Sequence, residues 1–284
     1  MKKKIITTII TCLICNYCIS QSSTQNPVNV SFDKESKMKY GFKFPNPEQD
    51  TMLIRLKKNY QIESLVKNAK TEYEKVLLAM NWVRNRWEHN GWNDADTKNG
   101  CTILERAEKG EKFRCVEYGI VLQNILNAIN IKARTLGLAT SNAETAKSSA
   151  GHVLTEVWLN DQQKWAMVDA QFDAMPILDG LPLNAIELQE AIVQEKPFKF
   201  INLKGDFTAK ETKKYMNFIP EYLYYFTTSF DVRLINKEDR YKIENKTHLL
   251  LVPIGAKNPV IFQRRYPWDY FIYTNSQADF YRKP

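Results

Sequence analysis

The strongest constraint on the fold is one apolar segment, residues 115–130. Hydrophobic residues recur within it at helical spacing over a broad face that runs from Val116 to Ile129. A face of that width has to be buried, so the segment predicts a helix in the protein core. Residues 131–138, 152–159 and 164–170 have strand-like patterns, and four polar residues that favour a hairpin turn join the last two.

Cys115 stands at the first position of this predicted helix. A helix N-terminus carries partial positive charge and unpaired N–H groups, which favour a thiolate over a thiol, and Arg114 adds a further positive charge. Because the thiolate is the nucleophilic form of cysteine, this position suits a catalytic nucleophile. The backbone N–H of Cys115 is then a natural donor to the oxyanion of a tetrahedral intermediate.

A cysteine nucleophile also needs a base and a group that orients the base. If the four-residue loop pairs Leu159 with Lys164, the predicted hairpin places Asp169 opposite Leu154. His152 points to the same face as Leu154, so His152 and Asp169 become diagonal neighbours within reach of a hydrogen bond. A register slip of one residue would place them on opposite faces. The hairpin therefore predicts that Asp169 orients His152.

Several segments resemble the transglutaminase-like superfamily, over about residues 72–173. FRCVEYG (113–119) with IKAR (131–134) is similar to its nucleophile helix and following strand, GHVLTEVW (151–158) and KWAMVD (164–169) to its histidine and aspartate strands, and NWV (81–83) with WEH (87–89) to a preceding helix. The resemblance implies an α+β fold with a papain-like core, in which the nucleophile helix packs on an antiparallel sheet. It also implies acyl chemistry through a thioester, with Cys115 as nucleophile, His152 as general base and acid, and Asp169 as its orienting group.

Members of this superfamily cross-link glutamine to amines, hydrolyse peptide or amide bonds, or have lost catalysis. In the animal cross-linking enzymes a tryptophan follows the cysteine, whereas this chain has Val116, and it has no calcium loop of the D-x-D-x-D-G kind. We therefore expect a cysteine hydrolase or protease that acts on a peptide, protein or small amide without a cofactor or metal. A cross-linking transglutaminase and an inactive module that binds peptide or glycan remain alternatives.

Other residues have two interpretations each. Trp82, Trp87 and Trp92 are candidates for substrate binding or for a second oxyanion donor through the indole N–H, although packing is the more common role. Cys101 could form a disulfide with Cys115 if the protein is exported, but the position of Cys115 favours a free thiol. Asp173 is an alternative to Asp169 as the orienting acid, and Arg134 is expected to pair with an acid in the fold. We expect His89 to be a surface or capping residue. The C-terminal aromatic residues are expected mainly to form core.

The first twenty residues have the layout of a secretory signal peptide. Three lysines precede an apolar run too short to span a membrane comfortably, and Ser20 precedes Gln21 at the expected cleavage site. We expect export to the periplasm or the extracellular space, with a lipoprotein as the weaker alternative. Removing residues 1–20 leaves a net charge of +5 and two of the five cysteines.

The remaining chain divides into three expected parts: an extended leader over residues 21–50, a transglutaminase-like core over 51–175, and a C-terminal α+β extension over 176–284 that packs on the core. The mild net charge and the absence of a basic stripe with interleaved aromatic residues exclude nucleic acid as the expected partner. No later segment has about 18 uninterrupted apolar residues, so no transmembrane segment is expected in the mature chain. The oligomeric state is left open.

Overall fold

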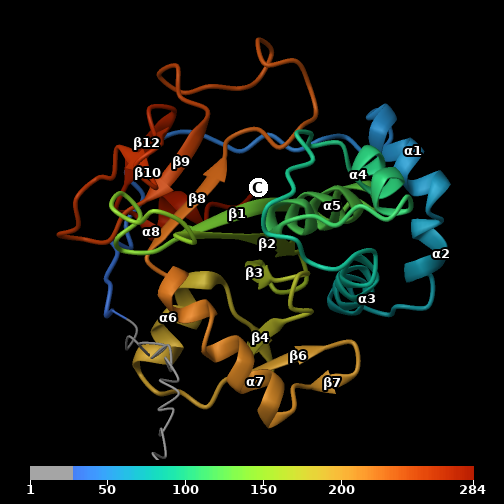
Figure 1. Ribbon diagram of the computed structural model, residues 1–284, viewed down its shortest axis with the longest axis horizontal. Helices are drawn as coiled ribbons and strands as arrows, with labels where there is room; N and C mark the ends of the chain where they lie inside the picture. The colour runs from blue at the N-terminus through green and yellow to red at the C-terminus, as the bar shows by residue number, and fades with distance from the viewer. Residues whose placement is uncertain (1–27) are drawn as a thin grey trace, which may run out of the picture.

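The computed structural model describes residues 28–284 (Figure 1), so the predicted signal peptide and the start of the predicted leader lie outside the described residues. The helices are α1 Thr51–Asn59, α2 Ile62–Val66, α3 Glu72–Arg84, α4 Gly100–Ala107, α5 Cys115–Ala128, α6 Ala185–Val193, α7 Ala209–Met216, the 3-10 turn η1 Ile219–Tyr222, and α8 Gln277–Phe280. The strands are β1 Ala133–Ala139, β2 Gly151–Leu159, β3 Lys164–Val168, β4 Met175–Leu178, β5 Leu181–Pro182, β6 Lys199–Asn202, β7 Gly205–Asp206, β8 Tyr225–Ser229, β9 His248–Leu251, β10 Ile261–Phe262, β11 Tyr266–Pro267 and β12 Phe271–Thr274. The fold is therefore a mixed α+β fold, as predicted.

A six-stranded sheet in the order β12-β9-β8-β1-β2-β3 forms the centre of the molecule (Figure 1). Its neighbouring strands run antiparallel except for β12 and β9, which are parallel. Helices α1 to α5 come before the sheet in the sequence, and α5 packs on β1 and β2. A smaller four-stranded sheet, β5-β4-β6-β7, lies beside α6 and α7.

The register of the β2–β3 hairpin is the one predicted from the sequence. Leu159 pairs with Lys164 and Thr155 pairs with Val168, so the side chains of the hairpin alternate as expected. Asp169 follows the end of β3 and forms an isolated bridge with Ala174. The predicted pairing is thus correct, and it carries Asp169 to the same end of the hairpin as the start of β2.

Helix α5 approaches β2 closely at a glycine. A Cβ atom on Gly119 would lie 3.1 Å from the carbonyl oxygen of Leu154 and 3.3 Å from Val153 Cγ1. Thr155 also donates a hydrogen bond of 3.0 Å from its hydroxyl to the Gly119 carbonyl. The absence of a side chain at residue 119 therefore allows the nucleophile helix to pack directly on the strand that begins with Gly151 and His152.

The two faces of the six-stranded sheet cover different cores. Ala133, Val157 and Val168 belong to a cluster with the apolar side chains of α1, α3, α4 and α5. Leu136 and Leu154 belong to a second cluster with α6, η1 and the C-terminal helix α8. This alternation follows from the period of two along a strand, and it buries most of the length of β2.

Side-chain caps mark the starts of α3 and α4. The Thr71 hydroxyl accepts a hydrogen bond from the Glu74 N–H at the start of α3, at the spacing of a capping box. Thr102 and Glu105 have the same spacing, but α4 begins before them, where the Asn99 side chain accepts from the N–H groups of Cys101 and Thr102. Asparagine is as good an N-cap as serine or threonine, so α4 starts at the earlier residue.

The central sheet contains strands from both sides of residue 175, the boundary predicted between the core and the C-terminal extension. Strands β8, β9 and β12 come from the predicted C-terminal extension, yet they extend the sheet of β1, β2 and β3 through the β1–β8 pairing of Gly137 with Thr227. The extension thus contributes half of the main sheet. Long-range strand pairing of this kind leaves no signature in the spacing of residues within either segment.

Arg134 pairs with a buried acid, as predicted. Its guanidinium lies 2.8 and 3.1 Å from Glu156 Oε2, and both side chains are fully buried. Arg134 also donates to the Phe280 carbonyl at 3.0 Å and stacks over the Trp165 ring at 4.2 Å. The pair therefore joins β1, β2 and the C-terminal helix α8.

We predict that Glu156→Ala lowers the free energy of unfolding by about 3–5 kcal/mol, because it leaves the buried Arg134 charge without its partner. Urea titration followed by circular dichroism measures this change. The exposed ion pair of Lys199 with Asp206, at 2.8 Å, gives a matched control, for which Asp206→Ala should cost about 1 kcal/mol or less. Equal losses in the two variants would contradict the prediction.

Candidate active site

Cys115 is the first residue of α5, and a buried carboxylate fixes the turn before it. Glu117 Oε2 accepts from the Arg114 N–H at 3.1 Å, while Oε1 accepts from the Arg114 guanidinium at 3.2 Å and from the Ala95 N–H at 3.1 Å. Glu117 is 1% exposed, whereas Cys115 keeps some exposed surface. The thiol therefore lies at a helix N-terminus whose entry is held in place by side-chain hydrogen bonds.

The predicted His152–Asp169 contact is present. His152 Nε2 lies 2.8 Å from Asp169 Oδ2, and both side chains are buried. Asp169 Oδ2 also accepts from the Tyr215 hydroxyl at 2.9 Å, and Oδ1 accepts from the N–H of Gln171 at 3.0 Å and of Phe172 at 3.3 Å. Four donors thus hold the carboxylate in one orientation, with His152 as one of them.

Aromatic rings surround the imidazole. The ring centroids of Phe218, Tyr222 and Phe172 lie 5.0, 6.0 and 6.1 Å from that of His152. This packing leaves His152 2% exposed and limits the rotation of its ring. Because Asp169 occupies Nε2, the nitrogen left for Cys115 is Nδ1.

His152 also lies near the Cys115 side chain, which is among the groups that raise its pKa. Burial lowers the pKa of His152, but the Asp169 charge and hydrogen bond, together with Cys115, outweigh it and raise the pKa from 6.5 to about 10. His152 is therefore an imidazolium at neutral pH. A positive charge beside a thiol at a helix N-terminus favours the thiolate, so the arrangement suits an ion pair of a cysteine and a histidine.

Cys115 and His152 both line a cleft of about 690 Å³. Its other walls come from residues 89–92, 137–139, 148–153 and the C-terminal segment 262–271. The rings of Phe262 and Trp268 stack there, 5.3 Å apart and nearly parallel, and give the cleft an apolar wall. The size and mixed lining fit an extended organic substrate rather than a single small ion.

The three tryptophans predicted as candidates for substrate binding lie in different environments. Trp92 is 91% exposed and lines the cleft. Trp82 does not line it but lies under the Arg86 guanidinium at 4.1 Å, and Trp87 is buried against Tyr118, with ring centroids 4.5 Å apart. Packing thus accounts for two of the three, and Trp92 remains placed for contact with substrate.

The structure also places the other residues that had two interpretations, namely Asp173, Cys101 and His89. Asp173 accepts a hydrogen bond of 2.9 Å from Asn81 Nδ2, whereas Asp169 is the acid beside the histidine. Cys101 and Cys115 are both free thiols, and Cys101 is buried with its sulfur 3.7 Å from the Met52 carbonyl. His89 is exposed, as predicted, but it also lines the cleft.

Comparison with known proteins finds a family model that matches the part of the chain carrying these residues. Residues 60–170, less than half of the chain, match the model of the transglutaminase-like superfamily. This segment is similar to that superfamily. This match agrees with the resemblance carried by the sequence motifs, and it includes Cys115, His152 and Asp169 within its bounds.

Two solved structures are similar at low identity. One is a candidate cysteine protease from Cytophaga hutchinsonii, 15% identical with a TM-score of 0.33, covering 46% of this chain and 46% of that chain. The other is a candidate protease from Parabacteroides distasonis, 14% identical with a TM-score of 0.31, covering 57% of this chain and 28% of that chain. The chain thus spans less than half the length of each of these proteins. No curated protein matches the sequence.

Sequence reasoning missed the residues that the C-terminal part adds to the transglutaminase-like core. Tyr215 on α7 hydrogen-bonds Asp169, and Phe218 packs against His152. Trp268 closes the far wall of the cleft. These residues lie 46 or more positions after Asp169, and the only signal for them was the general abundance of aromatic residues near the C-terminus.

No metal or membrane feature accompanies the site. Between residues 28 and 284, no group of three or more His, Cys, Asp or Glu side chains is arranged to hold a metal ion. Within the same stretch, none of the helices combines the length and the apolar character needed to cross a bilayer.

We predict that His152 keeps its proton at pH 8, where a histidine with a pKa of 6.5 is almost entirely neutral, because its own pKa is raised to about 10. An NMR pH titration of the imidazole resonance, assigned as the one lost in His152→Asn, measures this. Asp169→Asn should lower the pKa by about 1–3 units, since the opposite charge is removed and burial remains.

Tyr215→Phe serves as the matched control for this titration, because it removes a hydrogen bond to Asp169 but keeps the carboxylate charge. Its effect on the pKa of His152 should be smaller than that of Asp169→Asn. A wild-type titration near pH 6.5, or an Asp169→Asn variant with an unchanged pKa, would contradict the prediction.

Proposed function

We propose that the protein is a cysteine-dependent hydrolase that cleaves a peptide or amide bond through a thioester, with Cys115 as nucleophile, His152 as acid and base, and Asp169 as the orienting group. The observation that carries this proposal is the position of His152. Its Nε2 is held by Asp169 at 2.8 Å, and His152 lines the same cleft as Cys115, which is among the groups that raise its pKa. The transglutaminase-like match and the cleft at Cys115 support the same reaction class.

In the first half of the proposed reaction, Cys115 Sγ attacks the carbonyl carbon of the substrate amide. The charge that develops on the carbonyl oxygen is stabilised at the N-terminus of α5, where the backbone N–H of Cys115 has no partner within the helix. Protonated His152 then gives its proton to the leaving amine, and the C–N bond breaks. The products are an acyl thioester on Cys115 and a free amine.

In the second half, water replaces the amine. His152, now neutral, takes a proton from the water as its oxygen attacks the thioester carbonyl, and the Cys115 thiolate leaves. Hydrolysis is proposed over transfer to an amine because the cleft is open to solvent and no dedicated amine site has been recognised. The buried contacts of Asp169 keep His152 in one orientation through both halves.

The proposed place of action is outside the cytoplasm. The support is the layout of residues 1–20, with three lysines, a short apolar run and Ser20 at the cleavage position. N-terminal sequencing of the protein secreted by, or extracted from the periplasm of, its bacterial host tests this, and an unprocessed Met1 would refute it.

We predict that iodoacetamide at pH 6 alkylates Cys115 much faster than Cys101, because Cys115 lies beside protonated His152 whereas burial shields Cys101 and raises its pKa. Peptide mapping by mass spectrometry measures both rates in one protein. His152→Asn should slow alkylation of Cys115 by tenfold or more. Equal rates at the two cysteines would contradict the proposed nucleophile and favour a binding module.

A second prediction concerns the reaction itself. Incubation with a mixed peptide library in ¹⁸O-labelled water should place the label in newly formed carboxyl groups, and Cys115→Ala should abolish it. A biotinylated alkylamine in the same mixture tests the cross-linking alternative. If the amine is incorporated and no ¹⁸O is found in carboxyl groups, hydrolysis is refuted. If both the labelled carboxyl groups and the amine adducts still form in Cys115→Ala, the cysteine mechanism is refuted.

A further inference from the structure

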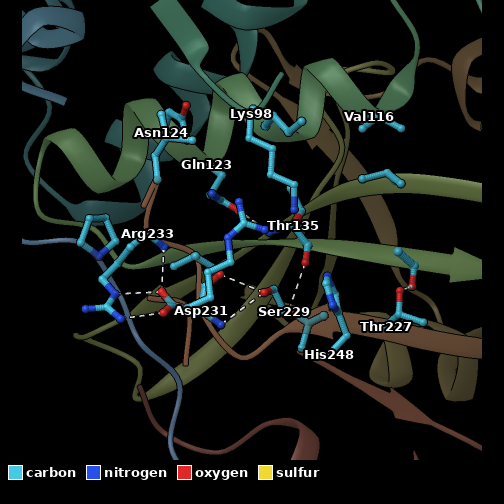
Figure 2. Close-up of a pocket in the computed structure, with 18 of the residues that line it drawn as sticks. Lys98, Val116, Gln123, Asn124, Thr135, Thr227, Ser229, Asp231, Arg233 and His248 are labelled. Atoms are coloured by element: carbon cyan, nitrogen blue, oxygen red, sulfur yellow. Dashed lines mark hydrogen bonds and ion pairs between the residues drawn. The ribbon is translucent and has the colours of Figure 1, made fainter. Parts of the chain in front are cut away.

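A second pocket of about 330 Å³ lies beside helix α5, on the sheet face that this helix only partly covers (Figure 2). Helix α5 packs on β1 and β2, while β8 and β9 continue the sheet beyond it. The space left there is lined by Gln123 and Asn124 of α5, Thr135 of β1, and Ser229 of β8 and His248 of β9. The chain segments around Lys98 and residues 231–240 form its outer wall.

This pocket is continuous with the catalytic cleft. Six residues on five different parts of the chain line both spaces: Val116, Gly137, Val153, Thr227, Tyr270 and Phe271. The first of them directly follows the proposed nucleophile in the sequence, and the third directly follows the proposed base. A substrate whose amide lies at the cysteine therefore has room to extend into the second pocket.

The cations that line the pocket outnumber its acids: Lys98, Arg233 and Arg240 stand against Asp50 and Asp231. Lys98 points into it from the segment before α4, as Figure 2 shows. Its pKa is lowered by desolvation and then by the nearby Arg240, although the side chain keeps exposed surface. Arg240 Nε is buried without a hydrogen-bond partner in the described part of the chain. Lys98 and Arg240 thus line the pocket, the first with exposed surface and the second with a buried N–H that lacks an acceptor.

Two acids line the pocket, Asp50 and Asp231. Asp50 Oδ1 accepts from the N–H groups of Met52 and Leu53, both at 3.0 Å, at the start of α1. Asp231 forms a bidentate ion pair with Arg233, at 2.9 Å from Nε and 2.6 Å from Nη2 (Figure 2). Asp231 also accepts from the N–H of Tyr241 at 2.9 Å. His248 adds no charge, because burial and the charges of Lys98 and Arg240 lower its pKa to about 3. With His248 neutral, three cations and two acids leave the lining with a net charge of +1.

Neutral donors complete the lining. Gln123 Oε1 accepts from the Thr135 N–H at 2.7 Å, and Asn124 Oδ1 accepts from the Gly100 N–H at 2.9 Å. With their oxygens used in this way, both side chains keep their amide N–H groups for another partner. Donors and cations around one space of this size are the features that recognise a carboxylate.

We propose that this cationic pocket, defined by Lys98, Arg240, Gln123 and Asn124, binds a carboxylate of the substrate, so that the protein acts on acidic peptides or amides. Lys98 and Arg240 supply the charge, and the two amides supply hydrogen bonds. The proposal rests on the proposed function for its link to catalysis, but binding of the acid itself does not require an active Cys115.

The test uses the full chain with Cys115→Ala, and glutarate as the probe, followed by NMR titration. Glutaramide is the uncharged match of the same shape, and inorganic phosphate is the competing anion. We expect saturable binding of glutarate, no saturable binding of glutaramide, and an increase in Kd of tenfold or more in Lys98→Met and in Arg240→Gln. Lys98→Arg should restore binding, which separates loss of charge from loss of folding.

Lys199→Met removes an exposed lysine on the smaller sheet and should leave the Kd for glutarate unchanged. Equal affinity for glutarate and glutaramide, or a Kd unaffected by Lys98→Met, would overturn the proposal. Binding of phosphate but not of glutarate would overturn the choice of a carboxylate.

The outcome for catalysis is read separately. If glutarate binds as expected but Cys115 forms no thioester, the cationic pocket stands and the hydrolase fails. If peptides are hydrolysed but Lys98→Met changes KM equally for acidic and neutral peptides, the hydrolase stands and the pocket has no role in selecting substrate.

Discussion

The close packing of α5 on β2 is the contact on which the rest of the site depends. Gly119 brings the helix to within van der Waals distance of the Leu154 carbonyl, and a larger residue there would push the two elements apart. Cys115 is one turn before Gly119 on the helix, and His152 is two residues before Leu154 on the strand. The distance between nucleophile and base is therefore set by backbone contact, which is far stiffer than a contact between flexible side chains.

Residues from the second half of the chain fix the orientation of Asp169 and His152. Tyr215 and the N–H groups of Gln171 and Phe172 donate hydrogen bonds to the buried Asp169 carboxylate, which lies next to His152. A buried carboxylate without such donors would favour its neutral form, and the pKa of His152 would fall with it. The aromatic rings around His152 then exclude water from the pair while Cys115 stays accessible from the cleft.

The same helix separates two kinds of environment. Its N-terminus faces the catalytic cleft, and its side next to β8 faces the cationic pocket. Val116 and Val153 lie between the two spaces, each directly after a residue of the proposed catalytic pair. Gln123 and Asn124 of the cationic pocket and Cys115 of the cleft lie on this one helix, which fixes the proposed amide donors relative to the proposed nucleophile.

The sequence by itself determined the local elements and the relation of His152 to Asp169. The wide apolar face of residues 115–130 requires a buried helix, and the period of two along a hairpin with a four-residue loop leaves one register that places these side chains on the same face. Only the tertiary structure decided that β8, β9 and β12 extend the same sheet, that Tyr215 reaches Asp169, and that Lys98 meets Arg240. Tyr215 and Asp169 are 46 positions apart, the β1–β8 partners Gly137 and Thr227 are 90 apart, and Lys98 and Arg240 are 142 apart. Packing complementarity selects such contacts, whereas spacing within a segment reports only on neighbours along the chain.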